Sequence, residues 1–163
     1  MVTSHILIGL NSVTRHLELL AANSAPATAP VRQPDINDKT SKRLENGASA
    51  PKPLSMVILM HPQPALSPSH AHIPTLLHLA TRQPDPISKA DEPTRLIALP
   101  TSDDARFASA LHIPRVGAIG VLEGAPGAKA LEDYVRQHVG VTECLWVDEA
   151  LQPEWRGLTV VQA

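Results

Sequence analysis

Apolar residues in this chain alternate between short continuous runs and stretches with helical spacing. Four continuous runs, at 5–10, 54–60, 95–99 and 116–122, predict the strands of a sheet. Between and after them, apolar residues recur at intervals of three and four positions, which is typical of helices that bury one face. The predicted order is β-α-β-α-β-α-β-α, and it favours an α/β fold: a single three-layer α/β/α sandwich with a mixed, largely four-stranded sheet.

Each predicted helix has a start signal and an apolar face. Asn11 is expected to cap a helix from Ser12 to about Asn23, and Pro74 to lie in the first turn of the second helix. Ser102 is expected to cap the third helix, and Pro126 to open the fourth. The residues expected to face the core are Val13, Leu17 and Leu20; Ile73, Leu76, Leu77 and Ala80; Phe107, Ala108 and Leu111; and Leu131, Tyr134, Val135 and His138.

The rest of the chain divides around these elements. Residues 24–53 are rich in Pro, Ala, Ser and Asn and have no apolar periodicity, which predicts a disordered insertion. Residues 1–23 and 54–148 are then two parts of one domain, and 149–163 form a C-terminal tail. An apolar patch at 145–147 is expected to add a strand or a packed end to the domain.

Composition narrows the possible functions. A net charge of −2 argues against a protein that coats nucleic acid through charge alone, so any RNA contact must be local. Four aromatic residues are too few for the stacking platforms of single-strand readers. The lone Cys144 excludes an intramolecular disulfide and fits a reducing compartment. Polar residues interrupt the apolar N-terminal stretch, which argues against a signal peptide, and no run is long enough to cross a bilayer. We therefore expect a soluble protein of the cell interior.

Two places carry candidate chemistry. At the first strand-to-helix junction, Gly9 permits close approach to the backbone, and the helix N-terminus, Asn11 and Arg15 can contact phosphate or a base edge. Ordinary helix capping with an exposed arginine explains the same residues. The second place holds His61, His70 and His72 after an apolar strand, where an α/β hydrolase or metal-dependent enzyme would gather catalytic groups. Their spacing does not match common zinc sites, and surface histidines are the alternative reading.

The stretch IGLNSVTRHLE at 8–18 resembles the signature of the kink-turn-binding ribosomal-protein superfamily. Together with the insertion after it and the stretch HIPRVGAIGVLEGAPGAKALEDYV at 112–135, it is most similar to the Pop family of fungal ribonuclease P/MRP protein subunits. The resemblance extends over nearly the whole chain and implies that family's fold. The chain departs from the superfamily at Ser12, where glutamate is usual, and at 61–62, where His-Pro replaces an acidic pair.

The resemblance also implies a function and a site. It implies a non-catalytic RNA-binding subunit in the nucleus, within the nucleolus, that supports tRNA and rRNA processing beside other protein subunits, with no cofactor, metal, membrane or small-molecule substrate. A snoRNA or ribosomal-particle kink-turn-binding protein is the alternative within the same fold. The residues that would contact kinked RNA are Gly9, Asn11, Ser12 and Arg15 at the junction, and Ile113, Pro114 and Arg115 in a loop against an extruded nucleotide.

Overall fold

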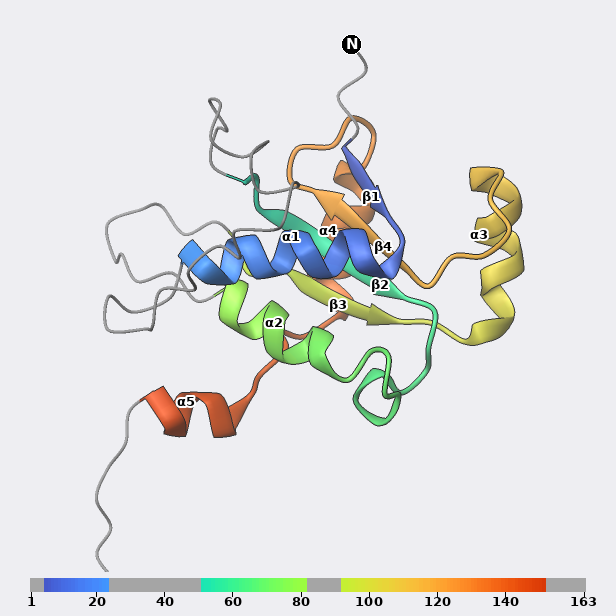
Figure 1. Ribbon diagram of the computed structural model, residues 1–163. Coiled ribbons are helices and arrows are strands. Elements are labelled where there is room, and N and C mark those ends of the chain that lie inside the picture. The colour runs from blue at the N-terminus through green and yellow to red at the C-terminus, as the bar shows by residue number, and fades with distance from the viewer. Residues whose placement is uncertain (1–4, 24–50, 82–91, 152–163) are drawn as a thin grey trace, which may run out of the picture.

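The computed structural model describes residues 5–23, 51–81 and 92–151, and in these ranges four strands form one mixed sheet (Figure 1). The strand order is β1-β4-β2-β3. The central strand β4 is antiparallel to both of its neighbours, whereas β2 and β3 are parallel. The strands are β1 (Ile6–Ile8), β2 (Leu54–Leu59), β3 (Arg95–Ala98) and β4 (Ala118–Leu122).

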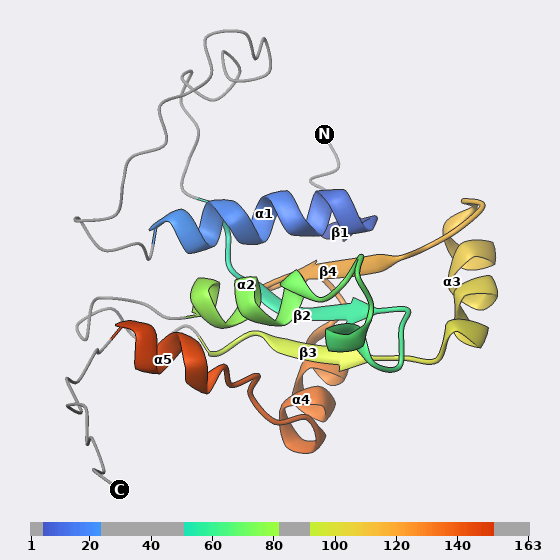
Figure 2. The same cartoon turned by 60° about the horizontal axis from the view of Figure 1, so that its bottom comes forward.

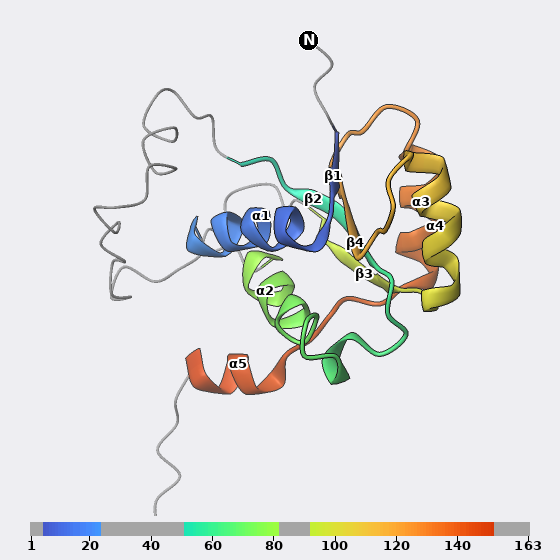
Figure 3. The ribbon, with the colours of Figure 1, turned by 45° about the vertical axis from the view of Figure 1, so that its right-hand side comes forward.

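Helices cover both faces of the sheet, which confirms the predicted α/β sandwich. Figure 3 shows α1 and α2 on one side of the strands and α3 and α4 on the other, with α5 beside α2. Figure 2 shows the same layering from another direction, with α1 and α4 on opposite sides of the sheet. The helices are α1 (Leu10–Asn23), α2 (His72–Thr81), α3 (Asp104–Leu111), α4 (Lys129–His138) and α5 (Leu145–Leu151), with short 3-10 turns η2 (Pro64–Leu66) and η3 (Thr101–Asp103).

Each face of the sheet has its own apolar core. Under α1 and α2, residues from both helices pack on β2 and Ala118 of β4; under α3 and α4, the second core contains Met56 and Ile58 of β2 and Val135 of α4. Every residue of β2 is buried, as expected for a strand covered on both faces. Because β2 and β4 both supply side chains to the two cores, these central strands join the two halves of the sandwich.

The predicted core faces of the first three helices are confirmed. Val13 and Leu17 of α1 and Ile73 of α2 are fully buried, and Leu77 of α2 is only 1% exposed. Pro74 lies in the first turn of α2, as predicted. In α3, Ala108 is buried and is flanked by the partly buried Phe107 and Leu111.

The predicted core face of the fourth helix is wrong. Leu131 and Tyr134 are 48% and 60% exposed and His138 is exposed, so only Val135 of the four predicted residues is buried. The buried face instead includes Glu132 beside Val135, with Ala128 and Val139 partly buried at its ends. The buried face of α4 has Glu132 and Val135 at i and i+3. Because glutamate is rarely buried, the spacing of apolar residues alone does not reveal this face.

Several element boundaries also differ from prediction. Helix α1 begins at Leu10, so Asn11 and Ser12 lie in its first turn and Asn11 does not precede the helix as a cap. Ser102 lies in η3, and α3 follows Asp103 without a side-chain cap. Pro126 lies in a turn between two glycines with positive φ, Gly124 and Gly127, and α4 starts only after it.

The C-terminal apolar patch at 145–147 forms a helix and not a strand. Helix α5 is attached to α2 by His78, whose two ring nitrogens face the Thr142 carbonyl at 3.2 Å and the Asp148 carboxylate at 3.1 Å. Most of the predicted insertion, residues 24–50, and most of the predicted tail, residues 152–163, lie outside the described residues.

Candidate nucleic-acid interface

The sheet topology brings four chain segments to one edge. The C-terminal ends of β1, β2 and β3 meet the N-terminal end of β4 there, because only β4 runs in the opposite direction. Backbone hydrogen bonds close this edge: Gly9 N–H donates to the Ala118 carbonyl at 2.8 Å, and Met60 N–H donates to the Gly117 carbonyl at 3.2 Å. The β1–α1 junction and the loop before β4 are therefore neighbours, although they are far apart in the sequence.

The β1–α1 junction depends on Gly9. Its φ of +96° lies in the region that L side chains avoid, and a Cβ placed there would meet no atom within 4 Å. Glycine is thus required by the backbone conformation and not by crowding. Val13 N–H donates the first intrahelical bond, to the Gly9 carbonyl at 3.1 Å, so the preceding amides of the first turn point out of the helix end.

The predicted RNA-contacting side chains of this junction are accessible. Asn11, Ser12 and Arg15 are all exposed, while Val13 between them is completely buried. This alternation places an amide, a hydroxyl and a guanidinium around the positive end of the α1 dipole, where an anion is favoured. Phosphate oxygens and base edges are both suitable partners for such groups.

The second predicted segment, the loop from His112 to Gly117, lies beside the first. Ile113 is partly buried against the core under α3 and α4, while Pro114 and Arg115 are exposed. A Cβ placed on Gly117 would lie 3.8 Å from the Leu10 Cβ, so the loop packs against the first turn of α1. All seven predicted site residues thus lie at one edge of the sheet, in two adjoining segments.

Asp104 holds this loop, a role that sequence reasoning missed. Its Oδ1 accepts a hydrogen bond from Val116 N–H at 2.7 Å, and its Oδ2 lies 4.0 Å from the Arg115 Nε. An acid at a helix start is expected to interact favourably with the helix dipole, and that expectation alone does not indicate a contact with the loop. No pattern in the sequence pointed to the actual contact, because it joins a helix start to the loop that follows the same helix.

The histidines of the rival interpretation lie at the same edge. His61 and His70 stack with ring centroids 5.5 Å apart, and the Ser67 hydroxyl hydrogen-bonds with the His70 Nδ1 at 2.9 Å. His72 hydrogen-bonds with the Thr14 hydroxyl of α1 at 3.1 Å, which joins the loop after β2 to the candidate interface. Among the described residues, no three His, Cys, Asp or Glu side chains are grouped so that they could hold a metal ion.

The pKa of His70 is lowered by its surroundings. Burial lowers its pKa below the usual 6.5, and the neighbouring charges of His61 and, more weakly, His72 lower it further. The Gly117 backbone acts in the opposite direction, yet the His70 Nε2 is buried without a hydrogen bond in the described part of the chain. Burial and the neighbouring histidines therefore favour the neutral form of the ring.

Taken with the sheet topology, these contacts define an α/β sandwich whose polar and cationic side chains gather where strands end and α1 begins. A scan against protein-family models, a search of curated proteins and a search of solved structures each found no match to this chain. Within the described ranges, no helix has both the length and the apolar character needed to span a bilayer.

Proposed function

We propose that this protein is a non-catalytic RNA-binding subunit of the ribonuclease P/MRP ribonucleoprotein, which binds a kinked element of the RNA and supports tRNA and rRNA processing. The observation that carries the proposal is the adjacency of the two segments that the family resemblance assigns to RNA. Gly9 and Ala118 are hydrogen-bonded, and Gly117 packs on Leu10, so the β1–α1 junction and the loop that carries residues 113–115 adjoin at Gly117.

The chemistry of this surface suits a bent RNA backbone. A sharp bend brings two strands close together, and a compact set of amide, hydroxyl and guanidinium groups can contact both. Asn11 can donate to and accept from a base edge, while the exposed Arg15 and Arg115 can pair with phosphates. The protein backbone at Gly9 carries no side chain that would keep RNA away.

The charge of the chain favours recognition of a local RNA structure. A protein with a net charge of −2 gains little from the diffuse field of RNA, so affinity must come from a few well-placed contacts. The Arg115 side chain is 88% exposed and touches Asp104 only at 4.0 Å, so its guanidinium is accessible to a phosphate. Recognition through a few such contacts depends on the shape of the RNA more than on its sequence.

Binding of purified full-length protein to kinked RNA with tandem sheared G·A pairs tests the proposal. We expect the kinked RNA to bind much more tightly at physiological salt than a straight duplex of equal length. Asn11→Ala and Arg15→Ala should each weaken binding roughly tenfold, since a hydrogen bond to a charged or polar RNA group contributes about 1.5 kcal/mol. Fluorescence anisotropy provides the affinities.

Two exposed residues of α4 serve as matched controls, because α4 begins beyond the opposite end of β4. Gln137→Ala removes a side-chain amide, as Asn11→Ala does, and Lys129→Ala removes a positive charge, as Arg15→Ala does, so both variants on this unrelated surface should leave RNA affinity unchanged. Circular dichroism of every variant checks that the fold is intact. Equal affinity for kinked and straight RNA, or equal loss in the α4 variants, would contradict the proposal.

A kink-turn-binding protein of a snoRNA or ribosomal particle would use the same surface with a different RNA. Sequencing of the RNA that co-purifies with the tagged protein separates the two. Ribonuclease P or MRP RNA supports the proposal as stated, whereas box C/D snoRNA or ribosomal RNA would replace it by this alternative.

A further inference from the structure

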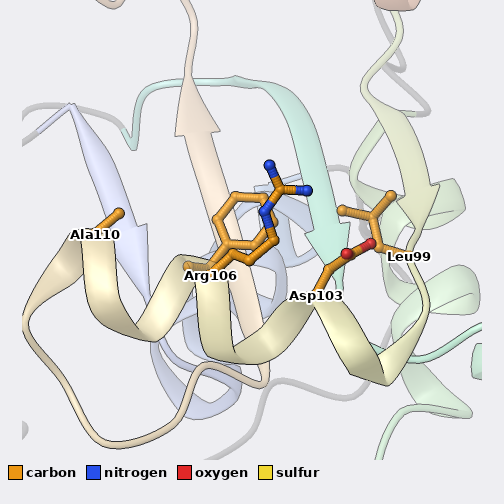
Figure 4. Close-up of a pocket in the computed structure, with 5 residues that line it drawn as sticks. Leu99, Asp103, Arg106 and Ala110 are labelled. Atoms are coloured by element: carbon orange, nitrogen blue, oxygen red, sulfur yellow. The ribbon is translucent and has the colours of Figure 1, made fainter.

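A pocket of about 460 Å3 opens beside α3, at the edge of the sheet that also carries the candidate interface. Its lining comes from the end of β3 and from η3 and α3, and consists of Leu99, Asp103, Arg106, Phe107 and Ala110. The volume is within the range of small-molecule sites, roughly 300–1,000 Å3. In Figure 4 the side chains of Leu99, Asp103, Arg106 and Ala110 all lie on the same side of the η3–α3 segment.

The pocket combines an apolar wall with two opposite charges that are not used elsewhere. Within the described part of the chain, neither the Asp103 carboxylate nor the Arg106 guanidinium has a hydrogen bond or ion-pair partner. The two residues are three positions apart, so their side chains begin about 5–6 Å from each other. Phe107 is half-buried against the core, which fixes its ring while leaving part of it accessible.

We infer that this pocket binds a guanine base. Guanine presents two adjacent donors, N1–H and the 2-amino group, which match the two oxygens of Asp103. On its other edge it presents two acceptors, O6 and N7, which match the fork of an arginine such as Arg106. Its flat faces suit contact with Phe107 and Leu99.

Other bases satisfy these groups less well. Adenine has one amino group between two ring acceptors, so it cannot give two adjacent donors to a carboxylate. Cytosine and uracil lack the acceptor pair of the purine edge that an arginine fork binds. A positively charged or negatively charged peptide side chain would pair with one of the two charges and leave the other unpaired.

The base can come from a free guanine nucleotide or from an unpaired guanosine in RNA. If it belongs to RNA, this inference rests on the proposed function and extends it. In that case the pocket beside α3 binds an unpaired guanosine, while the loop that follows α3 contacts the kink. The same base chemistry serves both sources, and the two arms of the test separate them.

The first arm titrates full-length protein with GMP, IMP and AMP, followed by ligand-observed NMR. IMP lacks only the 2-amino group, so it probes Asp103 alone. We expect GMP to bind roughly tenfold more tightly than IMP or AMP, in line with the discrimination that one good bidentate pair provides. Asp103→Asn should remove the difference between GMP and IMP, and Arg106→Gln should weaken GMP roughly tenfold.

The second arm uses kinked RNA with an unpaired guanosine beside the kink, and the same RNA with inosine or 7-deazaguanosine at that position. Inosine should weaken binding to the wild type but not to Asp103→Asn, and 7-deazaguanosine should weaken binding to the wild type but not to Arg106→Gln. The charge-matched controls Glu149→Gln and Lys129→Gln change exposed residues of α5 and α4 and should behave like the wild type.

The outcomes separate the pocket from the proposed function. Equal binding of GMP and AMP, or guanine preference that survives both pocket variants, overturns the inference. RNA binding that depends on Asn11 and Arg15, with no GMP binding and no effect of the base analogues, overturns the pocket and leaves the proposed function intact. GMP binding that needs Asp103 and Arg106, with no affinity for RNA, supports the pocket and refutes the proposed function.

Discussion

His70, at the edge that carries the candidate interface, makes the stability of the folded protein depend on pH. Its pKa in the folded protein lies below that of the unfolded chain, first because of burial and then because of the charges of His61 and His72. The unfolded state therefore binds more protons than the folded state as pH falls through about 6.5. The stabilising effect of a neutral His70 is present above that pH and is lost below it.

We predict that the free energy of unfolding decreases between pH 8 and pH 5.5, and that His70→Gln reduces the size of this decrease. Urea denaturation at the two pH values measures both quantities. Ser67→Ala serves as control, because it removes the hydroxyl that contacts the His70 Nδ1 and keeps the titrating ring. A His70→Gln variant with the full wild-type pH dependence would contradict this explanation.

At the scale of elements, the ends of helices decide how the interface loop is shaped. Helix α3 ends at Leu111. The next residue, His112, has a left-handed φ of 55° and ψ of 39°, and its N–H donates to the Ala108 and Ser109 carbonyls. Glycine is the usual residue at such a position, because an L side chain there costs about 1–2 kcal/mol. The turn that starts the 113–115 segment is therefore made at some cost in stability.

We predict that His112→Gly stabilises the protein by about 1 kcal/mol through relief of this strain. Thermal or urea unfolding should show the gain. As a comparison, His112→Ala keeps a Cβ at the same φ and should give little or none of it. If both variants lowered stability equally, a contact of the His112 imidazole would stabilise the protein by more than the left-handed backbone destabilises it, and the prediction would be wrong.

Packing between elements explains why β4 has a glycine at position 120. A Cβ at Gly120 would lie 3.3 Å from the Leu54 Cδ2 and 3.4 Å from the Leu7 Cβ. The crowding comes from side chains of the adjacent strands β2 and β1. Which side chains lie beside Gly120 follows from the order of strands in the sheet, which a sequence does not state.

At the scale of the whole molecule, the low net charge limits how RNA binding can depend on salt. If Arg15 and Arg115 supply the phosphate contacts, the logarithm of the binding constant should fall with the logarithm of salt concentration at a slope of roughly 1.4 to 1.8. This follows because each neutralised phosphate releases about 0.7–0.9 of a counterion.

Affinities at salt concentrations between 50 and 300 mM, on the order of the physiological range, would measure this slope. Arg15→Gln should lower it by about one. A slope of roughly six or more would contradict the two-arginine surface and assign the phosphate contacts to further basic residues, such as those at 39–43.

The sequence predicted the succession of strands and helices along the chain, the burial of β2 and the inward faces of α1, α2 and α3. In these elements the apolar residues are continuous or regularly spaced, and burial of apolar area decides the outcome locally. The face of α4 was not predictable, because Glu132 occupies a buried place that apolar periodicity does not reveal.

The candidate interface was predicted as a set of residues but not as a surface. Gly9 was recognisable beside a strand end, yet its contact with β4 depends on β4 running antiparallel between β1 and β2. The same strand order brings His61, His70 and the loop held by Asp104 to one edge. Local side-chain pattern thus determined which elements form, whereas contacts between distant segments were decided only by the tertiary structure, because they depend on strand order and direction.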